Sequence, residues 1–327
     1  MKKKIITGFL LVLLLLFDSC QGLTDFIPPD FEEKLCVNAV INNGRDQNKI
    51  IVEKTYQNEY PSEVKASLED LSVIISSESG VVFEYFNPKS ENRIDTIRLP
   101  ADMEFIPDQK YTLIISEKKS ESITSEIVMP HSPSNPEISI EGMVQTFLPP
   151  LQECHNPVTS IVLSVNFRSD EDQFYYLDIE GYMNPYYNDT LRYLIDYDII
   201  ESNTSYFRAF IHGFMSFGFR ICRSDFLIPA HIYQPCFFDS KTIPGNACNF
   251  KIKIDINTLY DFTRQIRVTL NSIPKDLYTY EKSYHTYLET LFDPFSEPVY
   301  IRGNIKGGYG IFAICGGSQT SLILPTD

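Results

Sequence analysis

Short apolar runs separated by turn residues follow one another along the chain from residue 36 to residue 130. Within most runs apolar and polar residues alternate, which is typical of strands with one face in a core. The expected strands are residues 36–41, 50–55, 71–76, 81–86, 93–99, 111–116 and 123–129. Short strands at this spacing predict a β-sandwich of the immunoglobulin or fibronectin type over residues 36–130.

A second β-rich region follows the segment PHSPSNPE, whose prolines indicate a boundary at residues 130–137. Its expected strands are residues 160–167, 174–182, 191–200, 205–221, 249–255 and 265–271. Near the end of the chain, EPVYIRGNI (297–305) and YGIFAIC (309–315) predict a closing hairpin around a glycine turn, and SLIL predicts a last strand. The second domain is therefore expected to cover residues 137–327.

One helix is expected in this second domain, over residues 273–291. Ser272 can cap it and Pro274 suits its first turn. The apolar positions recur at helical spacing, and they are Leu277, Tyr280, Tyr284, Leu288 and Leu291. We interpret this stripe as a packing face. The fold class predicted for the whole chain is all-β, with a sandwich followed by a larger β-rich domain that carries one helix.

The N-terminus predicts export and lipid attachment. Lysines at positions 2–4 precede an apolar run over residues 5–17, which is shorter than the roughly 20 residues of a membrane-spanning helix and reads as a signal peptide. The run ends in FDSC, which resembles the lipobox of bacterial lipoproteins, although Asp18 departs from the usual small or apolar residue. We therefore expect residues 1–19 to be removed and acyl chains to hold Cys20 on a membrane. Residues 20–35 then form a polar, proline-bearing tether.

The charge of the chain argues against nucleic acid as a partner. The net charge is −15, and removal of residues 1–19 takes away three lysines and one aspartate, which leaves −17. Binding to phosphate backbones needs a basic surface. The chain has 20 tyrosines and 23 phenylalanines but no tryptophan, a composition that favours β-structure and argues against a sugar-stacking platform.

The order of the C-terminal motifs resembles a known family. LNSIPKDLYTYEKSYHTYL is followed by DPFSEPVYIRGNIKGGYGIFAICG and SLIL, as in the Bacteroidota lipoproteins of domain-of-unknown-function family 4249. The segments LCVNAVIN, LSVIISSESGVVFEY and QKYTLII are similar to the N-terminal pattern of that family. The resemblance implies an outer-membrane lipoprotein, facing the cell exterior and associated with TonB-dependent transporters. It implies no enzymatic activity, cofactor or functional residue.

The residues themselves predict no catalytic or cofactor site. The motifs HExxH, CxxC and GxSxG do not occur in the sequence. Cys154 and His155 are adjacent, but neighbours on a strand point to opposite sides, so adjacency is weak evidence for a nucleophile and its base. The acidic run at residues 170–172 lacks the spacing of a calcium loop, and we interpret it as a solvated turn. We therefore expect a protein that is not an enzyme and that has no metal or cofactor.

Covalent modification offers three further predictions. Six cysteines follow Cys20 and allow fifteen complete pairings, and we expect Cys236 and Cys248 to form a disulfide across a turn-like segment. Two Asp-Thr-apolar tripeptides match the O-glycosylation pattern of Bacteroidota, with Thr96 and Thr190 as acceptors. The acceptor hydroxyl must reach solvent, which favours Thr190 because it lies beside a turn.

Two classes of function agree with these observations. The favoured class is a non-catalytic surface lipoprotein, an accessory subunit of a TonB-dependent transporter or another outer-membrane β-barrel complex. The alternative is a substrate-capturing protein that binds a peptide, a glycan or a metal complex and delivers it to a transporter.

Overall fold

The computed structural model describes residues 33–45, 48–55, 67–89, 93–118, 120–146, 158–183, 192–194, 197–208, 236–255, 263–290 and 295–324. All of the helices and strands below belong to one compact unit, which comprises Lys34–Lys54 and Lys65–Asp327. Cys20, Cys154, Cys222 and Thr190 lie outside the described residues.

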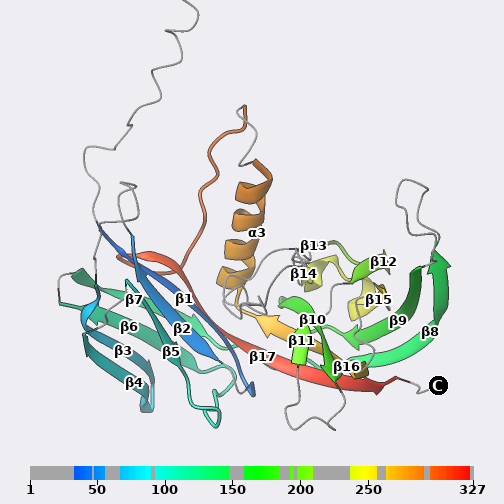
Figure 1. Cartoon of the computed structure of the whole chain (residues 1–327), viewed down its shortest axis with the longest axis horizontal. Coiled ribbons are helices and arrows are strands. Elements are labelled where there is room, and N and C mark those ends of the chain that lie inside the picture. Colours follow the sequence, from blue (N-terminus) through cyan, green and yellow to red (C-terminus); the bar gives the residue numbers. More distant parts are fainter. Residues whose placement is uncertain are drawn as a thin grey trace, which may run out of the picture. The chain divides into compact units, whose positions relative to one another are not determined.

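The first sandwich has two layers around one apolar core (Figure 1). One layer is a four-stranded sheet in the order β4-β3-β6-β7, formed by β4 (Gly80–Lys89), β3 (Glu69–Ser77), β6 (Lys110–Glu117) and β7 (Ser120–Val128). The other layer contains β1 (Leu35–Asn42), β2 (Lys49–Lys54) and β5 (Ile94–Arg98), which lie at one end of a nine-stranded sheet. The one-sided alternation of these strands buries one face of each layer against the other.

The second sandwich is built in the same way around a second core. Its four-stranded sheet has the order β12-β15-β9-β8 and consists of β12 (Asp198–Ser202), β15 (Ala247–Asp255), β9 (Val158–Arg168) and β8 (Glu137–Thr146). The remaining strands of the nine-stranded sheet are β10 (Phe174–Met183), β11 (Arg192–Leu194), β13 (Tyr206–Arg208), β14 (Cys236–Asp239), β16 (Thr263–Ile273) and β17 (Tyr309–Ile323). Two 3₁₀ turns, η2 (Ser240–Thr242) and η3 (Pro244–Asn246), connect β14 to β15.

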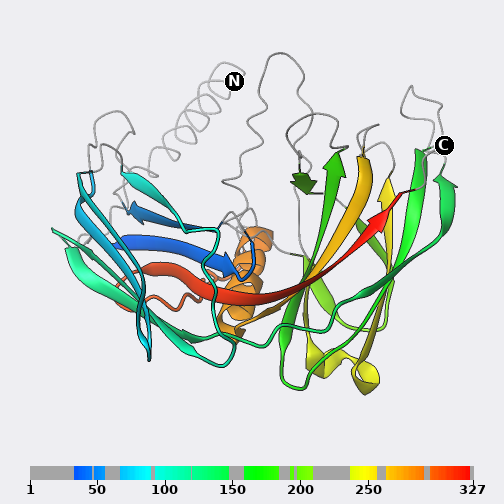
Figure 2. The same cartoon turned by 90° about the horizontal axis from the view of Figure 1, so that it is seen from below.

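Strand β17 belongs to both sandwiches (Figure 2, red). Its residues 309–315 pair in parallel with β1, and its residues 316–323 pair antiparallel with β16. Phe312 and Ile314 enter the core of the first sandwich, although they are distant from it in sequence. The nine-stranded sheet is therefore continuous across the expected boundary at residues 130–137.

The proline-rich segment at this expected boundary lies over one face of β17. Ser318 Oγ donates to the carbonyl of Ser134 at 3.0 Å, and Thr320 Oγ1 donates to the carbonyl of Pro136 at 2.6 Å. Proline has no backbone N–H and cannot extend a ladder. The segment forms no ladder with β17 and is held by side chains of that strand.

Helix α3 (Lys275–Thr290) packs on the face of the nine-stranded sheet that is opposite to the two sandwich cores. Leu277 and Tyr280 contact a third apolar cluster, which includes Ile311, Ala313 and Cys315 of β17. This helix agrees with the one expected over residues 273–291. Among the described residues it is the one α-helix, and the predicted all-β fold class is confirmed.

The structure differs from the predicted elements in three places, and it leaves part of a fourth element outside the described residues. Residues 297–305 form no ladder, so the expected closing hairpin is absent and the last two expected strands are the single strand β17. The expected strand at 191–200 is two strands, β11 and β12, in different sheets. The predicted strand over 205–221 corresponds to β13, and residues 209–221 lie outside the described part. Strands β8 and β14 were not predicted.

Candidate functional site

Strand β10 carries a row of polar side chains on the α3 side of the nine-stranded sheet. Tyr175, Leu177 and Ile179 enter the core of the second sandwich, so the alternate residues point to the opposite face. There, Asp178 and Glu180 are 0% and 1% exposed. Two buried carboxylates side by side on one strand need a positive partner.

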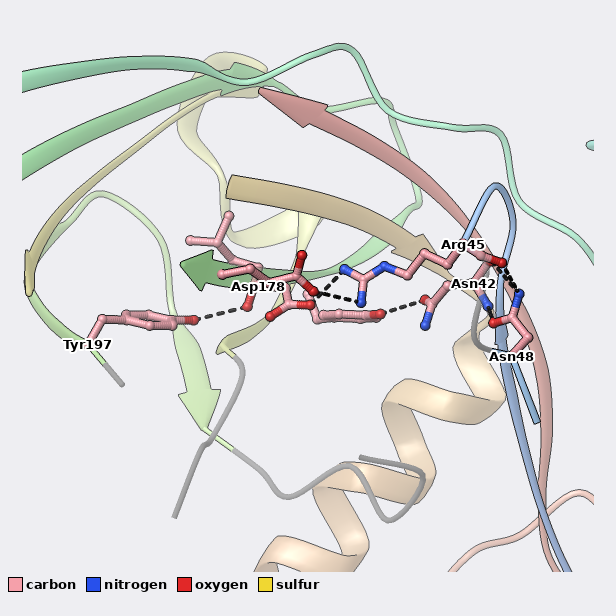
Figure 3. A network of polar contacts seen from close by, with 8 residues as sticks. Asn42, Arg45, Asn48, Asp178 and Tyr197 are labelled. Carbon is pink, nitrogen blue, oxygen red and sulfur yellow. Dashed lines mark hydrogen bonds and ion pairs between the residues drawn. The ribbon is translucent and has the colours of Figure 1, made fainter. Parts of the chain in front are cut away.

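That partner is Arg45, which comes from the turn between β1 and β2 (Figure 3). The side chain of Asn48 shapes this turn: its Oδ1 accepts from the backbone N–H of Asn42 at 2.8 Å, and its Nδ2 donates to the carbonyl of Asn42 at 2.8 Å. Nη2 of Arg45 then lies 2.7 Å from Oδ2 of Asp178, and Nη1 lies 3.3 Å from Oε1 of Glu180.

The charges of this cluster stabilise one another. Burial disfavours the charged guanidinium of Arg45, but the negative charges of Asp178 and Glu180 outweigh that effect and raise the pKa of Arg45. Burial raises the pKa of Tyr176 well above its usual value, so its hydroxyl stays protonated. That hydroxyl donates to Oδ1 of Asn42 at 2.6 Å. The β1–β2 turn is thus joined to β10 by one ion-pair network and one buried hydrogen bond.

Strand β16 extends the polar row. Its residues Thr269 and Asn271 stand opposite Asp178 and Tyr176, and paired residues of neighbouring strands share a face. Both are buried, and Oγ1 of Thr269 and both amide atoms of Asn271 have no hydrogen-bond partner among the described residues. Buried polar atoms normally have a hydrogen-bond partner, so these atoms could still form hydrogen bonds with another group.

The cluster has the chemistry of recognition and of structural support. Its charged groups are an arginine and two carboxylates, and it contains neither a histidine nor an activated thiol. Burial raises the pKa of the nearby Cys315 thiol, with a smaller opposing effect of Arg45, which keeps that thiol protonated and a poor nucleophile. Within the described part of the chain, no group of three or more metal-ligating side chains occurs.

The histidines and the other thiols of the described part lie apart from this cluster. His131 is exposed and lies 2.6 Å from Asp108, and His285 lies 3.4 Å from Glu289 on α3. Burial raises the pKa of Cys248 to about 12. These positions offer no pairing of a nucleophile with a base.

The predicted modification sites fall in different places. Thr96 lies on β5 and is exposed, as glycosylation requires. In the same tripeptide, the carboxylate of Asp95 accepts a hydrogen bond from Nδ2 of Asn87 at 2.9 Å. Glycosylation at Thr96 stays a prediction, and Cys20 and Thr190 lie outside the described residues.

The predicted bond between Cys236 and Cys248 is not formed. Cys236 is on β14, which pairs with β10, whereas Cys248 is on β15, which pairs with β9. The intervening segment passes from one sheet to the other. The turn-like segment between the two cysteines therefore carries them onto different sheets.

Sequence reasoning missed the cluster of Arg45, Asp178 and Glu180. The signal was the alternation in YYLDIEG, which places Tyr176, Asp178 and Glu180 on one face of a strand. A polar face of a strand usually indicates that it is exposed to solvent. Arg45 precedes Asp178 by 133 residues, and nothing in the local pattern of β10 indicates that so distant a turn supplies the arginine.

Comparisons with known proteins identify a family. The family described as "Domain of unknown function (DUF4249)" matches residues 24–321. No curated protein matches the sequence. In the part that the structure describes, none of the helices combines the length and apolarity needed to cross a membrane.

Solved structures show only distant likeness. Trypsin-activated alpha-2-macroglobulin from Escherichia coli is 7% identical with a TM-score of 0.22, over 75% of this chain and 15% of that one. Collagen adhesin from S. aureus is 10% identical with a TM-score of 0.17, over 90% of this chain and 95% of that one.

Proposed function

The chain belongs to the DUF4249 family, and from this premise we propose that it is a non-catalytic outer-membrane lipoprotein. In this proposal Cys20 carries the lipid, and the β-rich body faces the cell exterior as an accessory subunit of an outer-membrane β-barrel complex. A TonB-dependent transporter is the partner that we favour.

The observation that supports a protein partner is an apolar edge strand. Among the strands that the structure describes, β8 is the last of its sheet and pairs with β9 alone. Its side chains Ile140, Met143 and Val144 are 36%, 62% and 47% exposed. An exposed apolar edge is a ready site for contact with another chain, because its backbone groups and its apolar side chains are both available.

Purification from native outer membranes tests this function. We expect the tagged protein to retain one barrel protein in stoichiometric amount, and Met143→Lys to weaken that association by introducing a charge on the β8 edge. Ile106→Lys is the matched control, since Ile106 is also 62% exposed but lies in a loop. Equal recovery of the barrel with both variants would remove β8 from the proposal, and recovery of no barrel would contradict the function.

The unpaired polar atoms of Thr269 and Asn271 favour a second candidate, the capture of a small polar ligand for delivery to a transporter. Native mass spectrometry of protein from its own host tests it. A retained small molecule that is lost in Asn271→Leu, with the fold intact by circular dichroism, would favour ligand capture over the accessory role. The polypeptide mass with lipid alone would count against it.

The anchor and the side of the membrane have their own tests. We expect Cys20→Ala to abolish membrane attachment, and a variant that still fractionates with the outer membrane would contradict lipidation at Cys20. Protease treatment of intact cells should digest a surface-exposed body, whereas full protection would place it in the periplasm.

A further inference from the structure

Exposed aromatic side chains concentrate in the segment that connects α3 to β17. Among the described residues five tyrosine or phenylalanine side chains are exposed, and three of them are Phe295, Tyr300 and Tyr309, at 94%, 78% and 51%. We call residues 295–309 the aromatic segment; it leads from the orange helix to the red strand in Figure 1. Large exposed aromatic groups that recur in one segment indicate a contact surface.

The aromatic segment is held firmly at its second half. The side chain of Asn304 brackets Phe312: its Oδ1 accepts from the N–H of Phe312 at 2.9 Å, and its Nδ2 donates to the carbonyl at 2.8 Å. The backbone N–H of Lys306 donates to the carbonyl of Thr124 at 2.7 Å. The backbone N–H of Arg302, two residues after Tyr300, also donates to Oγ of Ser283 at 3.0 Å, so Tyr300 and Tyr309 both belong to an attached segment.

The aromatic segment also lies where the N-terminal part of the chain joins the fold. Tyr309 pairs with Cys36 at the start of β1. Gly308 lies so near Leu35 that an added Cβ would be 2.5 Å from the carbonyl oxygen of Leu35. Fourteen residues lie between Cys20 and Leu35, and the fifteen steps from one to the other, at about 3.3–3.6 Å each, reach at most about 54 Å. A lipid on Cys20 would keep this end of the body within that distance of the bilayer.

The charge of the aromatic segment differs from that of the whole chain. It contains Arg302, Lys306 and Glu297, all exposed, so its net charge is +1, whereas the chain carries −15. Lipid phosphates would repel most of the acidic surface but not this segment. Tyrosine suits the boundary between headgroups and acyl chains, because its ring is apolar and its hydroxyl bonds to headgroups.

We propose that Phe295, Tyr300 and Tyr309 contact the interface of the lipid bilayer to which Cys20 anchors the chain. This inference rests on the lipid anchor of the proposed function. It adds that the body lies against the membrane at the aromatic segment.

The absence of tryptophan from the sequence allows a single-tryptophan test. The full-length lipidated protein with Tyr300→Trp is reconstituted in phosphatidylcholine vesicles that contain brominated lipids. We expect its emission to shift to shorter wavelength and to be quenched most by lipids brominated near the headgroup, at the depth of about 5–10 Å where interfacial groups lie. Phe86→Trp is the matched control, because Phe86 is 61% exposed but lies on the edge strand β4.

Each outcome decides one point. Quenching of Tyr300→Trp without quenching of Phe86→Trp supports the contact. Equal, unquenched emission from both variants, on vesicles to which the protein floats, overturns the contact and leaves the anchor intact. A shift to shorter wavelength without lipid quenching indicates a protein surface at this position and also overturns it. A protein that does not float with the vesicles refutes the lipid anchor, and the membrane contact with it.

Discussion

Arg45 lies between two carboxylates at a position where its loss would leave both of them buried. Its guanidinium side chain is 13% exposed, and those of Asp178 and Glu180 are 1% exposed. Removing one member of a buried ion pair leaves an uncompensated charge, which typically lowers the free energy of unfolding by about 3–5 kcal/mol.

We therefore expect Arg45→Met to destabilise the protein by that order, measured by urea denaturation at neutral pH. Arg98→Met is the control, since Arg98 is exposed on β5, and its effect should stay within about 0.5 kcal/mol. Equal midpoints for the two variants would show that the Arg45 network does not stabilise the fold.

Glu281 is a second residue whose burial has a measurable consequence. Neither of its carboxylate oxygens has a hydrogen-bond partner in the described structure, and burial raises its pKa well above the usual 4.5. A raised pKa means that its neutral form is favoured in the fold. The free energy of unfolding is therefore highest below the pKa that Glu281 has in the unfolded chain. It falls as the pH rises from that value to the pKa of Glu281 in the folded protein.

Glu281→Gln keeps the shape of this side chain and cannot ionise. We expect it to unfold at the same temperature as the wild type at low pH, and to become the more stable protein as pH rises above 4.5. The difference grows by up to about 1.4 kcal/mol per pH unit until the folded pKa is reached. Thermal unfolding across this range measures it, with the exposed Glu289→Gln as the control. Parallel pH profiles of wild type and Glu281→Gln would contradict the buried neutral acid.

At the scale of elements, the sequence predicted strands where one face is buried and failed where both faces are alike. β1, β3 and β6 alternate between buried and partly exposed positions, and all three were predicted. The described side chains of β8 are exposed or only partly buried on both faces, and three of the four residues of β14 are buried, so neither shows a clear period of two. The strand predicted at 297–305 is absent for another reason. The backbone N–H and carbonyl of Phe312 bond to the side chain of Asn304 and not to the backbone of a neighbouring strand.

Gly310, at the start of β17, shows why the sequence motif around this strand contains glycines. Its φ is +103°, and an added Cβ would lie 1.9 Å from the carbonyl oxygen of Val37, on backbone that cannot move aside. We expect Gly310→Ala to prevent folding or to yield aggregated protein. At Gly142 nothing lies within 4 Å of the added Cβ, and Gly142→Ala should fold normally. Soluble yield and near-ultraviolet circular dichroism compare the two, and a well-folded Gly310→Ala protein would contradict the packing of β1 against β17.

Asn304 offers the corresponding test for the edge of β17. Asn304→Ala leaves the N–H and the carbonyl of Phe312 without their partner, and an unsatisfied buried group costs about 1–3 kcal/mol. Ser318→Ala removes one solvent-exposed hydrogen bond from the same strand and should have a smaller effect. Chemical denaturation distinguishes them, and a larger loss for Ser318→Ala would reverse this view of the edge.

At the scale of the whole molecule, long-range pairing is what the sequence could not supply. The apolar pattern predicts that residues 309–315 form a strand, but it does not indicate that their parallel partner is β1, more than 250 residues earlier. The same holds for the candidate site, whose arginine and carboxylates come from distant segments. Residue types and strand faces could be predicted locally, whereas their association depends on topology.

Because both sandwiches share strand β17, we expect that the first sandwich does not fold as an independent domain. A fragment of residues 34–136 has a domain's length, but it lacks Phe312, Ile314 and Ile305, which complete the core of the first sandwich. It also leaves the β17-facing edge of β1 unpaired. We expect this fragment alone to be unfolded or aggregated, and the full chain to unfold in one cooperative transition, because the nine-stranded sheet joins both cores.

Amide dispersion in NMR spectra of the fragment measures whether it is folded. Adding a peptide of residues 295–324 should restore folding through the β1 edge and the vacant core positions, whereas a peptide with Phe312→Asp should not. A dispersed spectrum from the fragment alone would establish residues 36–130 as an independent domain.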